Sequence, residues 1–259
     1  EITPDALRIL LQPNTTVLFL EAPGSLTFEM QDIRGLCAVA KAHGCITMLD
    51  YTWVTPLYVA PFELGVDIAI QAVTKYVSGH SDLLMGAVSC KELHGKTLFK
   101  ASCQLGNSVS GDDCYLALRG LRTMEIRLRQ QIEHTWSVVN WLEKQSEIVA
   151  ILYPPHPKDA GHEHWKSHYS GASALFAVVM RDGTTRDDIA TLTNALHHFG
   201  MGFSWGGYES LIVPFQPAEI RTTTSKWHVD QWCIRFHIGL ESPEDLILDL
   251  AQAFEKLRS

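Results

Sequence analysis

The fold of this chain is constrained most by four short apolar runs in its first third. Helix-length segments separate them. The runs are residues 16–20, 46–50, 66–73 and 85–89. Residues 33–43, between the first two runs, read as a helix that Gly44 stops. Apolar strands that alternate with helices are typical of a mostly parallel sheet with helices on both faces. The sequence therefore predicts an α/β fold.

A long helical segment separates this region from a second one. Residues 112–144 keep apolar side chains at approximately helical spacing, with Ser110 as a capping residue and Gly120 as a weak point. Further expected elements are strands at 175–179 and 232–238, a helix at 185–199 and a last helix that starts at Ser242. We therefore expect three regions, which are residues 1–111, a connecting helix at 112–148 and a smaller C-terminal α/β domain at 149–259.

Composition argues against several kinds of partner. The chain has 21 Lys and Arg side chains against 29 Asp and Glu, which gives a net charge of −8. An acidic chain without a dense basic block binds nucleic acid or anionic membranes poorly. No apolar run approaches the length that crosses a bilayer. The six cysteines form no C-x-x-C pair, so we expect reduced core thiols and a cytoplasmic location.

Two segments resemble catalytic motifs but fail on spacing. Gly95-Lys96-Thr97 looks like the end of a phosphate-binding P-loop, yet Cys90 stands where that motif needs its first glycine. The segment Gly106-Asn-Ser-Val-Ser-Gly111 is one residue too long for the G-x-S-x-G turn of a nucleophilic serine. Neither segment predicts an activity.

A group of three histidines raises the question of a metal site. His164 and His168 would share a helix face, with His162 nearby. No fourth ligand and no glutamate at H-E-x-x-H spacing accompany them. We therefore favour a solvated helix that carries histidines, and we predict no metal.

Asp50 and Lys75 each close an apolar run, so both are expected at the carboxyl edge of the parallel sheet. Sheets of this kind place their ligands at that edge. A lysine in low-dielectric surroundings loses its proton more easily and can attack a carbonyl, and a nearby carboxylate can pair with a pyridinium nitrogen. From the spacing alone, however, the more common interpretation is structural: Lys75 would extend to solvent and Asp50 would cap a helix.

Longer motifs change that balance. Residues 71–82, Gln-Ala-Val-Thr-Lys-Tyr-Val-Ser-Gly-His-Ser-Asp, resemble the cofactor-lysine motif of the Cys/Met-metabolism family of pyridoxal-phosphate enzymes. Leu49-Asp50-Tyr-Thr-Trp53 is similar to the family's Asp-Asn-Thr motif, and Glu21-Ala-Pro-Gly-Ser25 to its Glu-Ser-Pro segment. Further matches stand at residues 120–123, 204–210 and 234–241. The resemblance implies a fold-type I enzyme, with residues 1–111 as the C-terminal part of the cofactor-binding large domain.

The resemblance also implies roles for the residues at the cofactor. Lys75 would bind pyridoxal 5'-phosphate covalently as an aldimine and, once released by substrate, remove the Cα proton. Asp50 would keep the pyridine nitrogen protonated, and Thr74 would contact the phosphate. No residue of this set is assigned to a metal.

Three further residues would bind the substrate, a small amino acid. The resemblance places Ser204 and Arg235 at the α-carboxylate, with Trp205 in the same segment. Strand alternation supports Arg235, because it points away from the apolar face that Ile234 and Phe236 share, and a guanidinium fork suits a carboxylate. On the strand pattern alone, a solvent-facing arginine is the more common outcome.

Three positions depart from the family pattern. Tyr51 stands where the family usually has Asn, which leaves a hydrogen bond near Asp50 in doubt. Ala72 replaces a phosphate-binding Ser, and Phe203 replaces a Tyr near the substrate pocket. None of the three removes a group that the chemistry requires.

Within the family, the Ser-Trp-Gly-Gly sequence at residues 204–207 resembles the branch that carries out β-elimination. This resemblance implies cleavage of L-cystathionine to homocysteine, pyruvate and ammonia, a transsulfuration step of methionine biosynthesis. Two alternatives stay open within the family: a γ-lyase, and a broad cysteine-conjugate lyase or cysteine desulfhydrase. A third is a non-catalytic regulatory binding protein with the same fold. The preference among cystathionine, cystine and other conjugates is not predicted.

The resemblance also implies missing parts. The chain starts at Glu1 and reaches the run at 16–20 almost at once, whereas the family has well over a hundred further residues upstream. Those residues supply the first strands of the sheet, a phosphate-binding helix start and an aromatic ring over the pyridine. We therefore expect an upstream N-terminal segment as a partner, and a homo-oligomer, a tetramer built as a dimer of dimers.

Overall fold

The carboxyl ends of three parallel strands meet at one edge of a four-stranded sheet, which confirms the mostly parallel α/β fold. The computed structural model describes residues 2–220 and 227–258, so Glu1 lies outside it. The strands of this first sheet, in spatial order, are β1 Val17–Glu21, β2 Ile46–Asp50, β3 Ile68–Ala72 and β4 Gly86–Cys90. Strands β1, β2 and β3 are parallel, and β4 runs antiparallel to β3.

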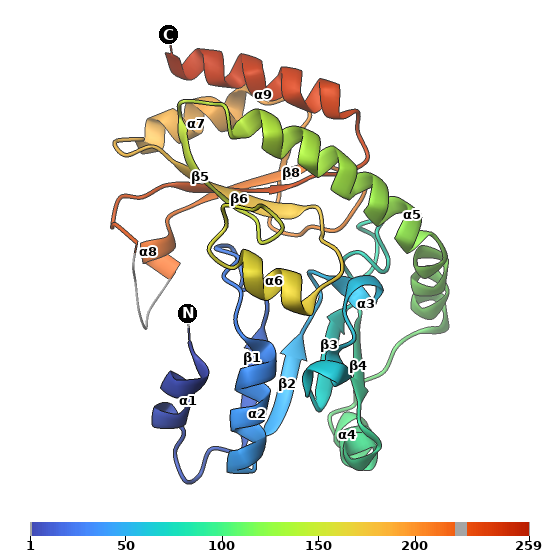
Figure 1. The fold of residues 1–259 in the computed structure, drawn as a ribbon. Helices are drawn as coiled ribbons and strands as arrows, with labels where there is room; N and C mark the ends of the chain where they lie inside the picture. Colours follow the sequence, from blue (N-terminus) through green and yellow to red (C-terminus); the bar gives the residue numbers. More distant parts are fainter. Residues whose placement is uncertain (1, 221–226, 259) are drawn as a thin grey trace.

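A second sheet forms from the C-terminal half of the chain. Its strands, in spatial order, are β5 Ile148–Leu152, β6 Leu175–Met180, β9 Cys233–His237, β8 Leu211–Phe215 and β7 Gly200–Met201. All neighbours are antiparallel except β7 and β8. Figure 1 shows β2 and β3 pointing toward this second sheet, so the carboxyl edge of the first sheet faces it.

Helices surround and connect the two sheets. They are α1 Pro4–Leu10, α2 Ile33–His43, α3 Thr55–Tyr58, a 3-10 helix Pro61–Leu64, α4 Glu92–Gln104, α5 Gly111–Leu142, α6 His162–His168, α7 Arg186–Ala195, α8 Pro217–Ile220 and α9 Pro243–Arg258. Helix α5 runs from the side of the first sheet to the second, where it lies with α7 and α9 (Figure 1). None of the described helices is long and apolar enough to cross a membrane.

Local signals fix several helix ends where the sequence places them. Helix α2 begins after Asp32, which accepts the Gly35 N–H, and ends at Gly44 with φ 86°. Ser110 accepts the Asp113 N–H at the start of α5. Gly120 does not break α5, and the main chain of residues 77–78 packs against it.

One helix is shorter than predicted, and another was not predicted. The helix expected at 185–199 begins after Thr185 but ends at Ala195, because the Asp249 carboxylate accepts the N–H groups of His197 and His198 and turns the chain away. Helix α4 is absent from the prediction. None of its residues is buried, so it has no apolar face of the kind that reveals a helix in a sequence.

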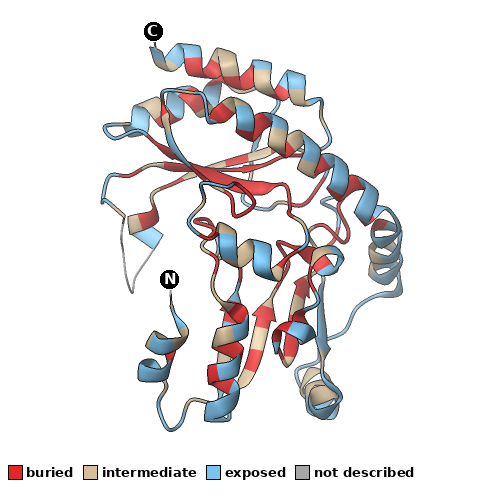
Figure 2. Ribbon diagram, viewed as in Figure 1, coloured by how far each residue is buried: buried red, intermediate tan, exposed pale blue. Residues whose placement is uncertain are grey.

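Burial is uneven across the structure, as Figure 2 shows. Every residue of β6 is buried, whereas β4 has none. Val17, Phe19 and Val88 are exposed, so the expected helical cover on both faces of the first sheet is incomplete in the described residues. All six cysteines are free thiols, but Cys103 and Cys114 are exposed, so the prediction of core thiols is wrong for these two.

Candidate active site

A cavity of about 140 Å³ lies where the carboxyl edge of the first sheet meets the second sheet. Four of the six residues predicted from the sequence line it, and these are Asp50, Lys75, Trp205 and Arg235. Other lining residues come from the end of β1 and the segment after it, from Thr52 and Trp53, from Ala72 and from Leu175. The edge position follows from the topology, since Asp50 ends β2 and Lys75 follows β3 by three residues.

Lys75 is half-buried and held by contacts at both ends. Its main-chain N–H donates to Ala72 O at 3.1 Å, and its carbonyl accepts the Gly79 N–H at 2.8 Å. Its Nζ donates to Ser204 Oγ at 2.8 Å and lies 5.1 Å from the centroid of the Trp205 ring. Burial, together with the positive charge of Arg235, lowers the pKa of Lys75. The amine is therefore more easily neutral than an ordinary lysine.

Asp50 is oriented by the main chain that follows it. Its Oδ1 accepts the Thr52 N–H at 2.9 Å. Thr52 Oγ1 in turn accepts the Ala72 N–H at 2.9 Å, which joins the ends of β2 and β3. The sequence left a hydrogen bond near Asp50 in doubt because Tyr51 replaces an Asn. In this chain a main-chain donor supplies a hydrogen bond to that carboxylate.

Arg235 is buried, with only 3% of its surface exposed, so the solvent-facing alternative is wrong. Its Nη2 donates to Phe203 O at 2.6 Å, and the guanidinium lies 5.1 Å from the Phe203 ring centroid. Burial lowers its pKa to about 10. Its Nε has no hydrogen-bond partner within the described part of the chain. A buried, unpaired N–H of a cation is costly, and a bound carboxylate would satisfy it.

The loop that carries Ser204 and Trp205 is fixed against Lys75. Gly206 adopts φ +87°, and a Cβ there would lie 2.8 Å from the carbonyl carbon of Lys75. His237 Nε2 lies 3.1 Å from Gly206 N and 3.2 Å from Gly207 O. Burial lowers the pKa of His237 to about 4, so the ring is neutral. The sequence alone indicates no role for His237, although it lies two residues after Arg235 on the same strand and so faces the same side.

Two predicted residues, Thr74 and Ser204, do not line the cavity, and Thr74 has other partners. Its Oγ1 donates to Met85 O at 3.1 Å and accepts the Met85 N–H at 2.8 Å. The hydroxyl thus ties the turn after β3 to the chain before β4. Its contact with a phosphate stays a prediction.

Two of the three histidines make contacts with the main chain. His168 Nε2 accepts the Ile33 N–H at 3.1 Å, and His162 Nδ1 lies 3.0 Å from Pro154 O. In residues 2–220 and 227–258, no group of three or more His, Cys, Asp and Glu side chains could hold a metal ion.

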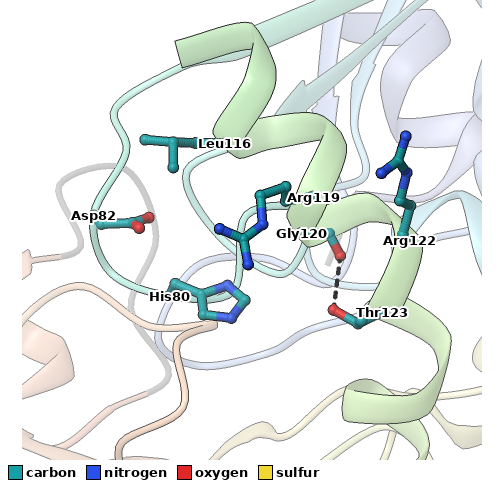
Figure 3. A pocket seen from close by; sticks show the side chains of 7 residues that line it. All are labelled: His80, Asp82, Leu116, Arg119, Gly120, Arg122 and Thr123. Atoms are coloured by element: carbon teal, nitrogen blue, oxygen red, sulfur yellow. Dashed lines mark hydrogen bonds between the residues drawn. The ribbon is translucent and has the colours of Figure 1, made fainter. Parts of the chain in front are cut away.

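A larger cavity lies elsewhere. It measures about 330 Å³ and is lined by His80, Asp82, Leu116, Arg119, Gly120, Arg122 and Thr123 (Figure 3). It contains none of the predicted site residues, and Arg119 and Arg122 lie on the exposed side of α5. Size alone therefore does not locate the candidate active site.

The residues around the smaller cavity fit pyridoxal phosphate. The Lys75 amine, with its lowered pKa, can bind an aldehyde. The Asp50 carboxylate, at the end of a neighbouring strand, can accept a hydrogen bond from a protonated ring nitrogen. The guanidinium of Arg235, which lines the cavity, offers a place for the carboxylate of an amino acid. The donor set thus suits the cofactor and an amino-acid substrate together.

The fold defines a class of protein, the fold-type I enzymes that use pyridoxal phosphate. A solved cystathionine γ-synthase from Xanthomonas oryzae pv. oryzae, in complex with cystathionine, superposes with a TM-score of 0.89. That likeness covers 98% of this chain and 67% of that chain at 27% identity. The chain belongs to the Cys/Met metabolism PLP-dependent enzyme family, whose model matches residues 2–255.

Two relatives are close in sequence. A cystathionine β-lyase of Bordetella avium is 43% identical over 251 residues, which cover 96% of this chain and 63% of that protein. An L-alanine/L-glutamate racemase of Wolbachia pipientis wMel is 40% identical over 248 residues, which cover 96% of this chain and 62% of that protein. The chain thus spans less than two thirds of the length of these relatives.

Proposed function

We propose that this chain is part of a carbon–sulfur β-lyase that cleaves L-cystathionine to homocysteine, pyruvate and ammonia with pyridoxal phosphate. The observation that carries the proposal is the position of the Lys75 amine. It contacts Ser204 and shares one cavity with Asp50 and Arg235. The 43% identity to a cystathionine β-lyase favours this reaction over others of the family.

Each residue has a distinct role in the proposal. Lys75 would hold pyridoxal phosphate until the substrate amine takes its place, and the cofactor would then supply an acceptor for the electron pair left at Cα. Asp50 would accept the N–H of its ring. Arg235 and Ser204 would bind the substrate α-carboxylate and orient the Cα proton toward Lys75 Nζ. The freed Lys75 amine would take that proton and then donate it to the departing sulfur.

Charge supports this order of events. Burial and the charge of Arg235 lower the pKa of Lys75, so the amine can be neutral when the cofactor attaches to it. A bound carboxylate would neutralise part of the charge of Arg235. The proton affinity of Lys75 would then rise at the moment when it must accept the Cα proton.

Three other reactions start with the same proton transfer. A γ-lyase would begin alike and break the Cγ–S bond, whereas a cysteine desulfhydrase would break the same Cβ–S bond in a different substrate. Racemisation would return the proton to the opposite face of Cα without a leaving group, and the 40% identity to an L-alanine/L-glutamate racemase favours it as the second candidate. A regulatory binding protein would not need Lys75, Asp50 and Arg235 together.

The remaining partners are part of the proposal. An upstream segment and further copies of the chain, in a dimer of dimers, would complete the cofactor site in the cytoplasm. The exposed apolar side chains Val17, Phe19 and Val88 on the first sheet support additional cover there. We also propose the domain division 1–111, 112–148 and 149–259, with α5 as the connecting helix.

Product analysis tests the function. The full-length protein is incubated with L-cystathionine, and pyruvate, 2-oxobutyrate and homocysteine are measured, with L-alanine racemisation assayed in parallel. Equal amounts of pyruvate and homocysteine support the β-lyase. 2-Oxobutyrate would instead indicate γ-cleavage, and D-alanine without pyruvate would indicate the racemase. A protein that binds no cofactor and turns over neither substrate would indicate the regulator.

A further inference from the structure

A buried arginine on α5, outside the candidate active-site cavity, holds the turn that follows Lys75. Arg127 is 8% exposed. Its Nη2 donates to Tyr76 O at 3.0 Å and to Gly120 O at 2.9 Å, and lies 3.4 Å from Val77 O. Its Nε donates to Thr123 Oγ1 at 3.2 Å. One guanidinium therefore joins the main chain next to Lys75 to the middle of the long helix.

Two glycines allow this close approach. A Cβ on Gly120 would collide with the carbonyl oxygens of Val77 and Ser78. A Cβ on Gly79, whose φ is +67°, would collide with Arg127 Nη1. Figure 3 shows Gly120 and Thr123 on one turn of α5, joined by the 3.2 Å hydrogen bond from Thr123 Oγ1 to Gly120 O. The helix and the turn are thus in main-chain contact, which leaves little room for the turn to shift.

The turn transmits this constraint to Lys75. The Gly79 N–H donates to Lys75 O at 2.8 Å, and Ser78 Oγ donates to Thr74 O at 3.0 Å. On the other side, the Tyr76 hydroxyl accepts the Ala174 N–H at 3.0 Å, which fixes the turn to the second sheet. Without Arg127, the Tyr76 and Val77 carbonyls would lose the donor that draws them against α5.

We propose that Arg127 is a positioning residue that fixes the main chain of Lys75, so that its Nζ reaches Ser204 and the cavity in the geometry needed for cofactor attachment and proton transfer. The proposal rests on the proposed role of Lys75. Arg127 acts on Lys75 only through hydrogen bonds to the neighbouring main chain. In this proposal it contacts neither the cofactor nor the substrate.

Two variants disturb the turn from different sides. Arg127→Lys keeps a positive charge but removes the fork that reaches both Tyr76 O and Thr123. Gly120→Ala leaves Arg127 intact and pushes the same turn away. Arg129→Met is the matched control, because Arg129 is an exposed residue of the same helix, 3.6 Å from Glu125.

The experiment follows cofactor attachment as well as turnover in the full-length protein. Apo protein is mixed with pyridoxal phosphate, and borohydride traps the fraction attached to Lys75 over time. For Arg127→Lys and Gly120→Ala we expect attachment and kcat to slow at least ~10-fold, since a misplacement of about 1 Å can cost about 100-fold. KM should stay within about twofold, because Arg235 and Ser204 belong to other elements. Arg129→Met should match the wild type.

The result that would overturn the proposal is a wild-type rate of attachment and a wild-type kcat in both variants, with only the melting temperature lowered. Arg127 would then stabilise the fold without positioning Lys75. If the unmodified protein itself attaches no cofactor to Lys75, the proposed function and this proposal both fail. If the cofactor attaches normally to Lys75 but cystathionine is not cleaved, only the assignment of the substrate fails. The role of Arg127 can then still be tested by the rate at which borohydride traps the cofactor.

Discussion

Lys75 Nζ and Ser204 Oγ are 2.8 Å apart although the residues lie 129 positions apart in the sequence. Lys75 belongs to the turn after β3 in the first sheet, and Ser204 to the loop between β7 and β8 in the second. The hydrogen bond therefore joins the two sheets at the cavity. Any change that moves one sheet relative to the other should alter the surroundings of the amine.

Replacement of Arg235 by lysine tests the carboxylate site. A single ammonium cannot reproduce the bidentate fork, so we expect KM for cystathionine to rise by roughly 10- to 100-fold. The absorbance of the attached cofactor should not change, because Asp50 and Lys75 remain. Steady-state kinetics with parallel spectra give both values. An unchanged KM would show that Arg235 does not bind the substrate.

The pKa of Lys75 gives a second prediction. Burial and the charge of Arg235 lower this pKa, so Lys75 in apo protein should react with an amine reagent at lower pH than an ordinary lysine. In Arg235→Met the positive neighbour is gone, and the midpoint of the reaction should move to higher pH. Peptide mass analysis of Lys75 adducts across a pH series measures both midpoints.

The exposed Lys96 in the same digest is the internal control for that series. Its profile should be identical in the two proteins, because it lies far along the sequence on the exposed α4. A Lys75 midpoint that stays fixed or moves to lower pH in Arg235→Met would contradict the electrostatic coupling.

His237 should make stability depend on pH. Its pKa falls from 6.5 to about 4 on burial, so the unfolded chain binds the proton more readily than the folded chain. The free energy of unfolding should be unaffected above pH 6.5 and should decrease as the pH falls from 6.5 toward about 4. The full loss amounts to about 3 kcal/mol.

Urea unfolding of the wild type and of His237→Asn between neutral and acidic pH measures this dependence. The variant should show a shallower loss of stability, since Asn does not titrate. His198→Asn, at an exposed position, should keep the wild-type slope. Equal slopes for His237→Asn and the wild type would contradict a buried neutral histidine.

The sequence predicts the part of the site that depends on strand ends. Asp50 and Lys75 follow apolar runs, and topology brings the ends of parallel strands to one edge. The buried state of Arg235 could not be predicted, because it depends on the loop at residues 202–204 that folds over it. The direction of the Thr74 hydroxyl could not be predicted either, since Met85 reaches it only when β4 pairs with β3.

Parts of the fold escaped prediction for a similar reason. Strand β8 contains Pro214, which interrupts a strand pattern, so its pairing with β7 and β9 defines it. The role of Arg127 depends on three main-chain carbonyls from two elements. A side chain that binds main-chain atoms of distant segments leaves no pattern in its own neighbourhood of the sequence.

The most direct test of the account is the site of covalent attachment. The full-length protein is treated with pyridoxal phosphate and borohydride and digested, and the labelled peptide is identified by mass, with Lys75→Ala processed alongside. We predict that the label lies on the peptide that contains Lys75, and that the variant has neither the label nor the cofactor absorbance. A label on another lysine, or unchanged labelling in Lys75→Ala, would contradict the assignment of this site.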